Sequence, residues 1–513
     1  MLNGAKKDLL SGVVGAGTMG RGIAQVAVAG GLWVKLFDKE QRVADEAVDF
    51  VAKMLRRAAE KGRTTNDFAE SAIGRLSATT DMNSLSDCDL VMEAIFEDLG
   101  VKQQLFRQLE NIVTPQCVLA TNTSSLSITE IASVCRNPNR VAGFHFFNPV
   151  PLMKLVEVVD GVRTSPEVTE ALETVGRRMG REPVRVKDSP GFLVNHAGRG
   201  YGPEALRILS ECIASPADID AIMTDAAGFR LGPFALLDLV GIDVAHPVME
   251  QIYRQYFHEP AYQPSVIGRQ RVAAGLLGRK SGVGFYDYGN ASQPAVERKS
   301  PPGNAPERVW ISRAEPDGHA ALVSLLRQLD VEIDAGAQPG KHAVCLVTPV
   351  GEDASTTAVA QGLDPARTLA VDTLFGLGGR RPVMQTAVTD PAQRDAVAAV
   401  LGKDGVSVTI INDSPGFVAQ RIVALIVNVG CNIAQQRIAA PSDIDTAVRL
   451  GLNYPSGPLE WGDAIGPARI LQILESLQAF YLDGRYRPSP WLRRRAALGV
   501  SLLTPDPETV SAS

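Results

Sequence analysis

The residues best suited to acid–base chemistry occur in one segment, VAGFHFFNPVPLMKLVEVV, at positions 141–159. His145 ends an apolar, strand-like run, which predicts a place at the carboxyl edge of a parallel sheet, where ligands bind in open α/β folds. Glu157 lies between apolar neighbours in the next strand-like run, and a carboxylate is costly to bury there without a partner. A His145–Glu157 pair would satisfy the carboxylate and leave one ring nitrogen to accept a substrate proton. A lone histidine near a strand end is often structural, so the local pattern leaves both interpretations open.

A glycine-rich turn, Gly15-Ala-Gly17-Thr-Met-Gly20, follows a predicted strand and opens a predicted helix. Gly15 would permit a tight turn, Gly17 would let the backbone approach a pyrophosphate, and Gly20 would let the helix pack closely on the strand. Asp38 ends the next strand, where its carboxylate can accept both ribose hydroxyls of NAD and would repel the extra phosphate of NADP. The pattern predicts an NAD site; the alternative is a glycine-rich turn that binds nothing.

The elements that would position these residues alternate between strand and helix. Strand-like runs occur at 11–14, 34–37, 90–94, 118–120, 141–144 and 154–159, and the amphipathic helices between them include 20–29, 42–61 and 101–111. This alternation predicts a mostly parallel, doubly wound α/β domain over residues 1–187. Residues 188–288 have helical periodicity and predict an all-α domain, and the Pro-, Ser- and Asn-rich stretch at 289–306 predicts a linker.

The chain then repeats itself. Asp188-Ser-Pro-Gly-Phe recurs at Asp413, 225 positions later. The same spacing relates Asp218 to Asp443, Gly232 to Gly457, and Asp238 to Asp463. We therefore expect a second helical domain at 413–500, after a degenerate α/β segment at 307–412. That segment lacks a glycine-rich turn, and Asp372 and Thr386 stand near the positions of His145 and Glu157, which predicts one active site per chain.

Composition limits the classes of partner. The formal net charge of -6 in 513 residues provides no basic field for nucleic acid or an anionic membrane. The six cysteines form no CxxC pair or His/Cys cluster, which argues against a metal site or a disulfide framework and favours a reducing compartment. The first residues lack the apolar core of a signal peptide, and no apolar run is as long as a membrane span, so a cytoplasmic location is expected.

Six motifs, in order, resemble the L-3-hydroxyacyl-CoA dehydrogenase family: GAGTMG, EAIFED, TNTSSL, HFFNPVPLMKLVEVV, DSPGFLVN and GRKSGVGFYDY. The resemblance extends from Ser11 to Tyr288. It implies a Rossmann-type NAD domain, a helical dimerisation-type domain, and oxidation of a 3-hydroxyacyl-CoA to a 3-ketoacyl-CoA in a cleft between them. The duplicated tail resembles longer bacterial members of the 3-hydroxybutyryl-CoA and 3-hydroxyadipyl-CoA type, which act in fatty acid β-oxidation or in the breakdown of aromatic acids such as phenylacetate.

The resemblance also implies roles for individual residues. His145 would be the general base and Glu157 its orienting partner, while Ser124 and Asn195 would bind and position the substrate. The residues implied for NAD binding are Gly15, Gly17, Gly20, Asp38, Glu97, Lys102, Asn148 and Lys280. Lys61 falls where the family has a lysine near the CoA phosphates.

Each of these assignments has a structural alternative. Ser124 could cap the helix that begins near residue 127, and Asn195 could cap or link the first helix of the next domain. Lys61, Lys102 and Lys280 could be solvated surface charges. The segment after Asn195, HAGRGYGPEAL, departs from the family because its three glycines weaken a helix, which leaves the shape of the acyl pocket open.

Two rival functions remain at this point. One is a dehydrogenase of free β-hydroxy acids, for which no lysine occupies the position of His145. The other is a non-enzymatic NAD-binding structural protein, against which the set His145, Glu157 and Ser124 argues. For the oligomeric state, the tail predicts a monomer with an internal pseudo-dimer, or a homo-oligomer.

Overall fold

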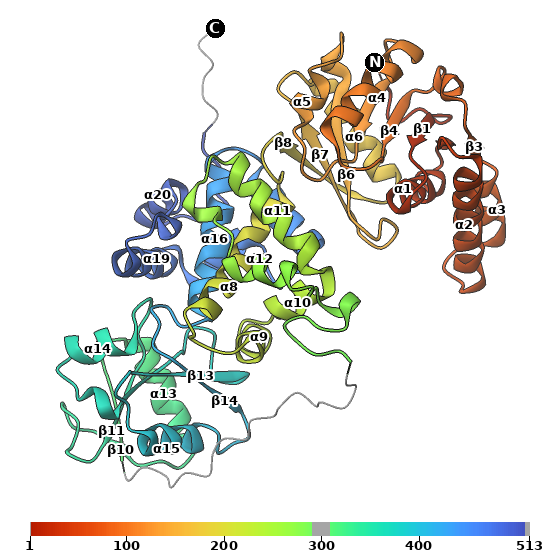
Figure 1. Ribbon diagram of the computed structural model, residues 1–513. Helices are drawn as coiled ribbons and strands as arrows, with labels where there is room; N and C mark the ends of the chain where they lie inside the picture. Colours follow the sequence, from red (N-terminus) through yellow and green to blue (C-terminus); the bar gives the residue numbers. More distant parts are fainter. Residues whose placement is uncertain (1, 290–307, 508–513) are drawn as a thin grey trace. The chain divides into compact units, whose positions relative to one another are not determined.

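The computed structural model describes residues 2–289 and 308–507 and divides into two compact units (Figure 1). The first unit comprises residues 1–196 and 436–452, and the second comprises 197–435 and 453–513. The linker predicted at 289–306 lies, after its first residue, outside the described residues. No described helix is both long and apolar enough to cross a lipid bilayer.

The first unit is built on an eight-stranded sheet with the order β3-β2-β1-β4-β5-β6-β7-β8. Its strands are β1 (Leu10–Val14), β2 (Trp33–Phe37), β3 (Leu76–Thr79), β4 (Leu90–Glu93), β5 (Val118–Thr121), β6 (Val141–Phe146), β7 (Leu155–Asp160) and β8 (Glu182–Lys187). All neighbours pair in parallel except β6 and β7, which are antiparallel. This confirms the predicted α/β class. The sheet has two more strands, β3 and β8, than the sequence pattern indicated.

Helices of the first unit pack on both faces of this sheet (Figure 1). They are α1 (Thr18–Ala29), α2 (Gln41–Glu60), α3 (Asn66–Ile73), α4 (Leu99–Ile112), α5 (Ile128–Ala132), α6 (Pro166–Arg178) and α17 (Pro441–Leu452), while α7 (Val194–Ala197) begins in this unit. Successive strand residues point to opposite faces, so Val13 and Val14 enter different hydrophobic clusters. A sheet covered on both faces explains why its strands are almost continuously apolar.

The second unit contains a smaller sheet with the order β10-β9-β11-β12-β13-β14. Its strands are β9 (Val309–Ile311), β10 (Ile333–Asp334), β11 (Val344–Val347), β12 (Thr368–Val371), β13 (Arg380–Gln385) and β14 (Ser407–Ile411), and its helices are α13 (Pro316–Gln328), α14 (Ala354–Ala360) and α15 (Pro391–Leu401). The antiparallel pair β12–β13 repeats the arrangement of β6–β7. This sheet is the degenerate copy that the sequence predicted, and it has two fewer strands than the first sheet.

The helical domain occurs twice. The first copy contains α8 (Gly202–Ser210), α9 (Pro216–Asp225), α10 (Pro233–Val240), α11 (Ile242–Gln255) and α12 (Val266–Ala273), and the second contains α16 (Ala419–Gln435), α17, α18 (Pro458–Ile465), α19 (Pro467–Tyr481) and α20 (Pro490–Leu498). Short 3-10 helices are η1 (Met82–Leu85), η2 (Pro138–Arg140), η3 (Gly198–Gly200), η4 (Pro260–Tyr262), η5 (Arg279–Ser281), η6 (Pro365–Arg367) and η7 (Gly484–Tyr486).

The repeated DSPGF motif has the same structural role in both copies. Asp188 accepts the Thr129 N–H at the start of α5, and Asp413 accepts the Ala354 N–H at the start of α14. A carboxylate at this point satisfies amide groups that have no partner within the helix. In both copies the motif therefore satisfies the first turn of a helix in the preceding α/β segment.

The two copies differ where the first contains three extra glycines. The second copy begins with one continuous helix, α16, whereas the first is broken into α7, η3 and α8. Gly200 is required by packing, because a β-carbon there would lie 2.7 Å from the Cα of Ile426 in α16. The weakened helix expected after Asn195 is confirmed.

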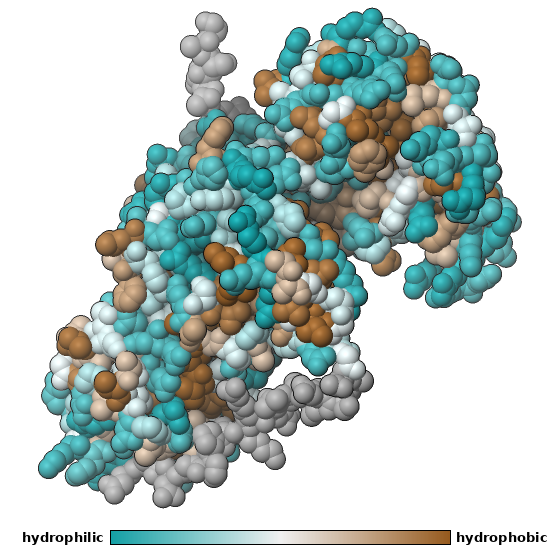
Figure 2. All heavy atoms as spheres, viewed as in Figure 1, coloured by the Kyte–Doolittle hydropathy of each residue, from teal (hydrophilic) through white to brown (hydrophobic). Residues whose placement is uncertain are grey.

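A buried charge cluster joins the two copies within the second unit. Arg421 of α16 is fully buried. Its guanidinium donates to Glu204 of α8, to Glu211 just after α8 and, at 2.8 Å, to the Tyr486 hydroxyl. An arginine buried at this depth is tolerable only because its N–H groups are paired. Elsewhere, apolar side chains gather on the surface over α10 and α12 (Figure 2), among them Leu239, Val240 and Val266.

Candidate active site

A buried histidine–glutamate pair lies on adjacent strands of the first sheet. The antiparallel register of β6 and β7 places His145 directly opposite Glu157, and Nδ1 of the ring is 2.6 Å from Oε2 of the carboxylate. Both side chains are buried. The other carboxylate oxygen, Oε1, accepts the N–H groups of Leu193 at 3.0 Å and Val194 at 2.8 Å. The carboxylate thus has partners on both oxygens and fixes a proton on Nδ1, which leaves the lone pair on Nε2.

Two aromatic rings hold the imidazole in place. The ring centroid of Phe147 is 4.4 Å and that of Phe192 is 5.9 Å from the ring of His145. Phe192 has a left-handed backbone conformation, φ 48°, which its equivalent Phe417 shares at 50°. A positive φ is unfavourable for a bulky residue and persists only where the surrounding packing imposes it. The turn that supplies the amide groups for Glu157 therefore also sets the position of Phe192 beside His145.

Glu97 organises the turn that contains Ser124. Its Oε1 atom accepts the Thr123 hydroxyl at 2.6 Å, the Ser124 N–H at 3.0 Å and the Ser125 hydroxyl at 2.9 Å. Burial opposes ionisation of Glu97, but these hydrogen bonds and the nearby Lys102 ammonium outweigh it and lower the pKa of the carboxyl. The bond from the Ser124 N–H to Glu97 fixes the backbone of Ser124. Ser124 does not cap α5, whose N-cap is Ser127.

Lys102 is buried, not solvated. Its ammonium is 2.6 Å from Glu93 and 3.4 Å from Glu97, and only 1% of its side chain is exposed. Glu93 also accepts the Thr121 hydroxyl at 2.7 Å. The surface-charge alternative for Lys102 is therefore wrong, because α4 turns this position toward the ends of β4 and β5. Lys102 supports the turns on which Glu97 and Ser124 lie.

The glycine-rich turn has the geometry that its residue types predicted. Gly15 has φ +100°, and a β-carbon on Gly20 would lie 1.7 Å from the Gly15 carbonyl oxygen. A β-carbon on Gly17 would meet nothing within 4 Å, so this side of the turn is open. Asp38, just beyond β2, accepts the Ala16 N–H at 3.0 Å. The turn and the acid are thus directly linked.

These groups share one edge of the first sheet. The glycine turn follows β1, Asp38 follows β2, Glu97 follows β4, Ser124 follows β5, and His145 lies at the end of β6. The five strands run parallel, so their carboxyl ends meet at the same edge, as the ligand sites of open α/β sheets do.

The asparagines assigned to the site also belong to the first unit. Asn195, in the first turn of α7, donates through Nδ2 to the Ser124 carbonyl at 3.4 Å. Asn148 is exposed in the loop that follows β6. The structure therefore brings Asn195 to Ser124 and leaves Asn148 accessible beside the strand that contains His145.

Two of the assigned lysines have no described contact with this group. Lys61 is exposed just beyond the last turn of α2, and no described contact joins it to the residues above. Lys280 lies in η5 of the second unit, where its ammonium is 2.7 Å from Asp243. The described contacts of Lys61 and Lys280 indicate no ligand for either side chain.

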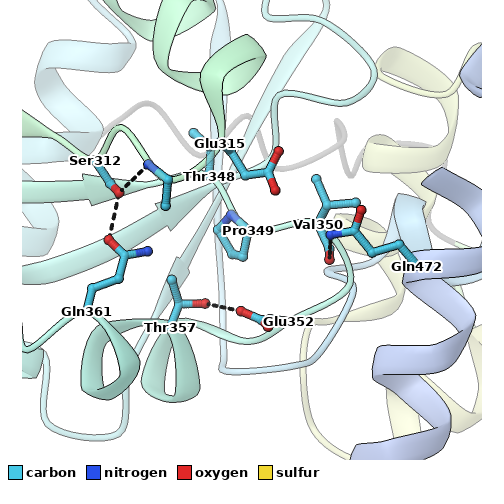
Figure 3. A pocket seen from close by; sticks show the side chains of 10 residues that line it. Ser312, Glu315, Thr348, Pro349, Val350, Glu352, Thr357, Gln361 and Gln472 are labelled. Carbon is cyan, nitrogen blue, oxygen red and sulfur yellow. Dashed lines mark hydrogen bonds between the residues drawn. The ribbon is translucent and has the colours of Figure 1, made fainter. Parts of the chain in front are cut away.

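The corresponding edge of the second sheet is occupied by side chains (Figure 3). Where the first sheet has its glycine turn, the chain runs Ser312-Arg-Ala-Glu315-Pro. The Ser312 hydroxyl bonds Gln361 at 2.6 Å, and Glu315, Thr348 and Glu352 line the same small cavity. Acidic and hydroxyl side chains replace the open backbone that a pyrophosphate needs, which supports the prediction that this copy is inactive.

The second sheet also lacks the base and its partner. The register of β12 and β13, with the bond from the Asp372 N–H to the Pro382 carbonyl, places Asp372 opposite Pro382. Pro382 is 225 positions after Glu157, so the expected counterpart, Thr386, is wrong. The error arose because sequence similarity in this region is too weak to fix the strand register, and a shift of four residues leaves each side chain on the same face of the sheet.

Asp372 provides a test of pH-dependent stability. Burial raises its pKa to about 6, since only one carboxylate oxygen is hydrogen-bonded, to Gln420 and to the Leu374 N–H. The pKa of Asp372 is higher in the folded protein than in the unfolded chain. The contribution of Asp372 to folding stability is therefore complete below about pH 4 and is lost as the pH rises through 6. Asp372→Asn should therefore be more stable than wild type at pH 8, by up to roughly 3 kcal/mol, and equally stable at pH 4.

Urea unfolding of both proteins at the two pH values measures this difference. Turnover of folded Asp372→Asn should match wild type, because the residue belongs to the copy that is predicted to be inactive. Equal stability at pH 8 would show that folding does not raise the pKa of Asp372.

Comparisons with known proteins agree with this arrangement. The family model for the NAD binding domain of 3-hydroxyacyl-CoA dehydrogenase matches residues 11–189, and the model for the C-terminal domain of the same family matches residues 191–288 and again 416–501. The chain is 40% identical over 488 residues to the 3-hydroxyadipyl-CoA dehydrogenase of Escherichia coli (strain K12), covering 95% of this chain and 97% of that relative.

Two further similarities show the long and the short forms. The crystal structure of 3-hydroxybutyryl-CoA dehydrogenase from Escherichia coli K12 matches with a TM-score of 0.84 and 36% identity, covering 96% of this chain and 98% of that chain. A probable 3-hydroxybutyryl-CoA dehydrogenase of Deinococcus radiodurans is 43% identical over 277 residues, which are 54% of this chain and 99% of that relative. The short form corresponds to the first α/β domain and the first helical copy alone.

Proposed function

Because the chain belongs to the 3-hydroxyacyl-CoA dehydrogenase family, we propose that it oxidises (S)-3-hydroxyacyl-CoA to 3-ketoacyl-CoA with NAD, and that His145 is the general base. The observation that carries the proposal is the 2.6 Å contact between Nδ1 of His145 and Glu157. It fixes the ring tautomer whose free lone pair, on Nε2, can accept a proton. Family membership supports the reaction class, and the contact supports the role of the residue.

In the proposed reaction, His145 Nε2 accepts the proton of the 3-hydroxyl group as the C3–O bond becomes a carbonyl. NAD, held by the glycine turn and Asp38, would supply the acceptor for the hydride released from C3. Glu157 stabilises the imidazolium that forms, because its carboxylate already accepts the Nδ1 proton. General-base action of this kind typically contributes about 10²–10⁴-fold to the rate. The hydroxyl group of Ser124 and the amide of Asn195 would hold the substrate oxygen near the base.

The residues of the first unit fit NAD. Gly17 leaves the turn open to a pyrophosphate, and as the N-cap of α1 it supplies no side chain that would occupy the first N–H groups of the helix. Those groups and the helix dipole favour a phosphate. Asp38 would accept the ribose hydroxyls, with Glu97, Lys102 and Asn148 as the further NAD-binding residues of this unit. The family resemblance also implies Lys280, which belongs to the second unit. Lys61 is the proposed contact for the CoA phosphates.

Assays with several acyl-CoA substrates test this function directly. Purified protein with acetoacetyl-CoA and NADH should consume NADH, and NADPH should support a much lower rate. We propose 3-hydroxyadipyl-CoA among the physiological substrates, as the Escherichia coli relative's name supports. A higher kcat/KM for 3-hydroxyadipyl-CoA than for 3-hydroxybutyryl-CoA would support a role in aromatic acid breakdown of the phenylacetate type; the reverse would favour fatty acid β-oxidation. Absence of turnover with every thioester would contradict the proposal.

We also propose that the enzyme works in a reducing compartment. All six cysteines are free, and five of them are buried, which fits a reducing compartment such as the cytoplasm. We propose that the two helical copies act as an internal pseudo-dimer, so that one chain supplies the packing that two subunits provide in short members. The function then requires an acyl-CoA substrate and NAD.

A further inference from the structure

Helix α17 comes from the second helical copy but packs in the first unit. It lies against β7 and β8, and the Lys187 N–H at the end of β8 donates to the Ile438 carbonyl, just before α17, at 2.8 Å. β7 is the strand that contains Glu157. A helix from the far end of the chain is therefore part of the structure that surrounds the catalytic pair.

The contact is reciprocal between the two copies. The Asn412 N–H donates to the Ile213 carbonyl at 2.9 Å, and Asn412 and Ile438 lie 225 positions after Lys187 and Ile213 respectively. Helix α9 of the first copy packs on β13 of the degenerate sheet. Each helical copy thus covers the sheet of the other copy, as an isologous interface requires when residue i contacts j and j contacts i.

The point where α17 comes nearest to the site is Gly451. A β-carbon there would lie 3.0 Å from Cδ2 of Leu155 and 3.0 Å from Cγ2 of Val194. Both side chains are buried and have little room to retreat. Val194 donates its N–H to Glu157, and Leu155 precedes Glu157 by two residues on β7. One layer of side chains separates Gly451 from the carboxylate that orients His145.

The equivalent residue of the first copy is not glycine. Ala226 lies 225 positions before Gly451, at the end of the helix that packs on the degenerate sheet. That sheet has Pro382 in place of Glu157, so nothing there must be held for catalysis. The copy that covers the active sheet has no side chain at this position, while the copy that covers the inactive sheet has a methyl group.

We propose that Gly451 is a positioning residue for the proposed His145–Glu157 base, so that the active site of the first α/β domain is completed by the second helical copy. The absence of a side chain at Gly451 lets Val194 and Leu155 sit where the Val194 N–H reaches Glu157. The inference rests on the proposed general-base function of that pair. A small displacement of a catalytic group by a remote change can cost about 100-fold in rate.

The test compares Gly451→Val with Ala226→Val, which places the same final side chain at the equivalent position of the helix that packs on the degenerate sheet. We expect kcat of Gly451→Val to fall about 10- to 100-fold with the KM for NAD nearly unchanged, and Ala226→Val to retain kcat. A steady-state assay with an acyl-CoA substrate and thermal unfolding of each variant provide the readouts. Equal kcat in both folded variants would overturn the proposal.

A second comparison remains informative if Gly451→Val does not fold. Gly451→Ala should lower kcat less, and adding Val194→Ala should restore it, because the shorter side chain makes room for the new methyl group. Independent, additive losses in the double variant would overturn the proposal. His145→Gln in parallel separates the two claims: normal turnover there contradicts the general-base function, whereas loss there with normal turnover in folded Gly451→Val contradicts only the role of Gly451.

Discussion

Replacement of His145 by glutamine should lower kcat by about 10²–10⁴-fold while NAD binds with unchanged affinity. Glutamine has similar reach but no group that accepts a proton near neutral pH. The glycine turn and Asp38, which are proposed to hold NAD, follow other strands, β1 and β2, so the turn that would bind the pyrophosphate should not change. The measurements are steady-state turnover of a 3-hydroxyacyl-CoA and NAD binding followed by NADH fluorescence.

The matched control is His319→Gln. His319 lies in α13 beside the degenerate sheet, and its Nδ1 is 3.1 Å from the Ser312 carbonyl oxygen. It should retain full turnover. Near-normal kcat in folded His145→Gln would show that the base is another group, and loss of NAD binding together with kcat would point to a structural defect in the sheet.

Replacement of Glu157 by glutamine should have an effect of similar size, for a different reason. The amide must keep its oxygen toward the N–H groups of Leu193 and Val194, which bond Oε1 in the wild type. Its NH₂ group then faces Nδ1 of His145, which must become an acceptor. The ring proton moves to Nε2, where it blocks the lone pair that the reaction needs. We expect kcat to fall by about 10²–10⁴-fold.

The tautomer itself can be observed. The chain has six histidines, so nitrogen-15 labelling of histidine gives a simple NMR spectrum in which the His145→Gln variant identifies the His145 signals. Wild type should show the proton on Nδ1 and Glu157→Gln should show it on Nε2. An unchanged tautomer in a variant that has lost activity would mean that Glu157 acts by stabilising the imidazolium and not by fixing the ring. Unchanged activity would remove Glu157 from the mechanism.

The duplication is symmetric in packing and asymmetric in chemistry. Asp188 and Asp413 cap equivalent helices, and the Lys187–Ile438 and Asn412–Ile213 contacts are related by the same offset. The features proposed for catalysis lie on the first sheet, whereas the second sheet has Ser312 and Glu315 in its turn and Pro382 in place of Glu157. Packing constrains the residues of both copies, because a helix of each copy packs on the sheet of the other. The proposed catalysis constrains only the residues of the first sheet.

Several features followed from the sequence alone. The glycine spacing at 15, 17 and 20 with Asp38 fixed a strand–turn–helix, because turn geometry depends on a few adjacent residues. The burial cost of a lone carboxylate among apolar neighbours was sufficient to pair Glu157 with His145. The 225-residue offset revealed the second helical domain, which the family comparison confirms.

Other features were decided only by tertiary structure. Lys102 looked like a helix-surface charge until α4 placed it between Glu93 and Glu97. Thr386 looked like the counterpart of Glu157 until strand pairing identified Pro382. Nothing local indicates that α17 packs on the first sheet, because α9 and α17 have nearly the same apolar pattern and either could cover either sheet. Periodicity and turn chemistry act over a few residues and set the elements; the choice between equivalent partners far apart in the chain is made by side-chain packing, which no local pattern encodes.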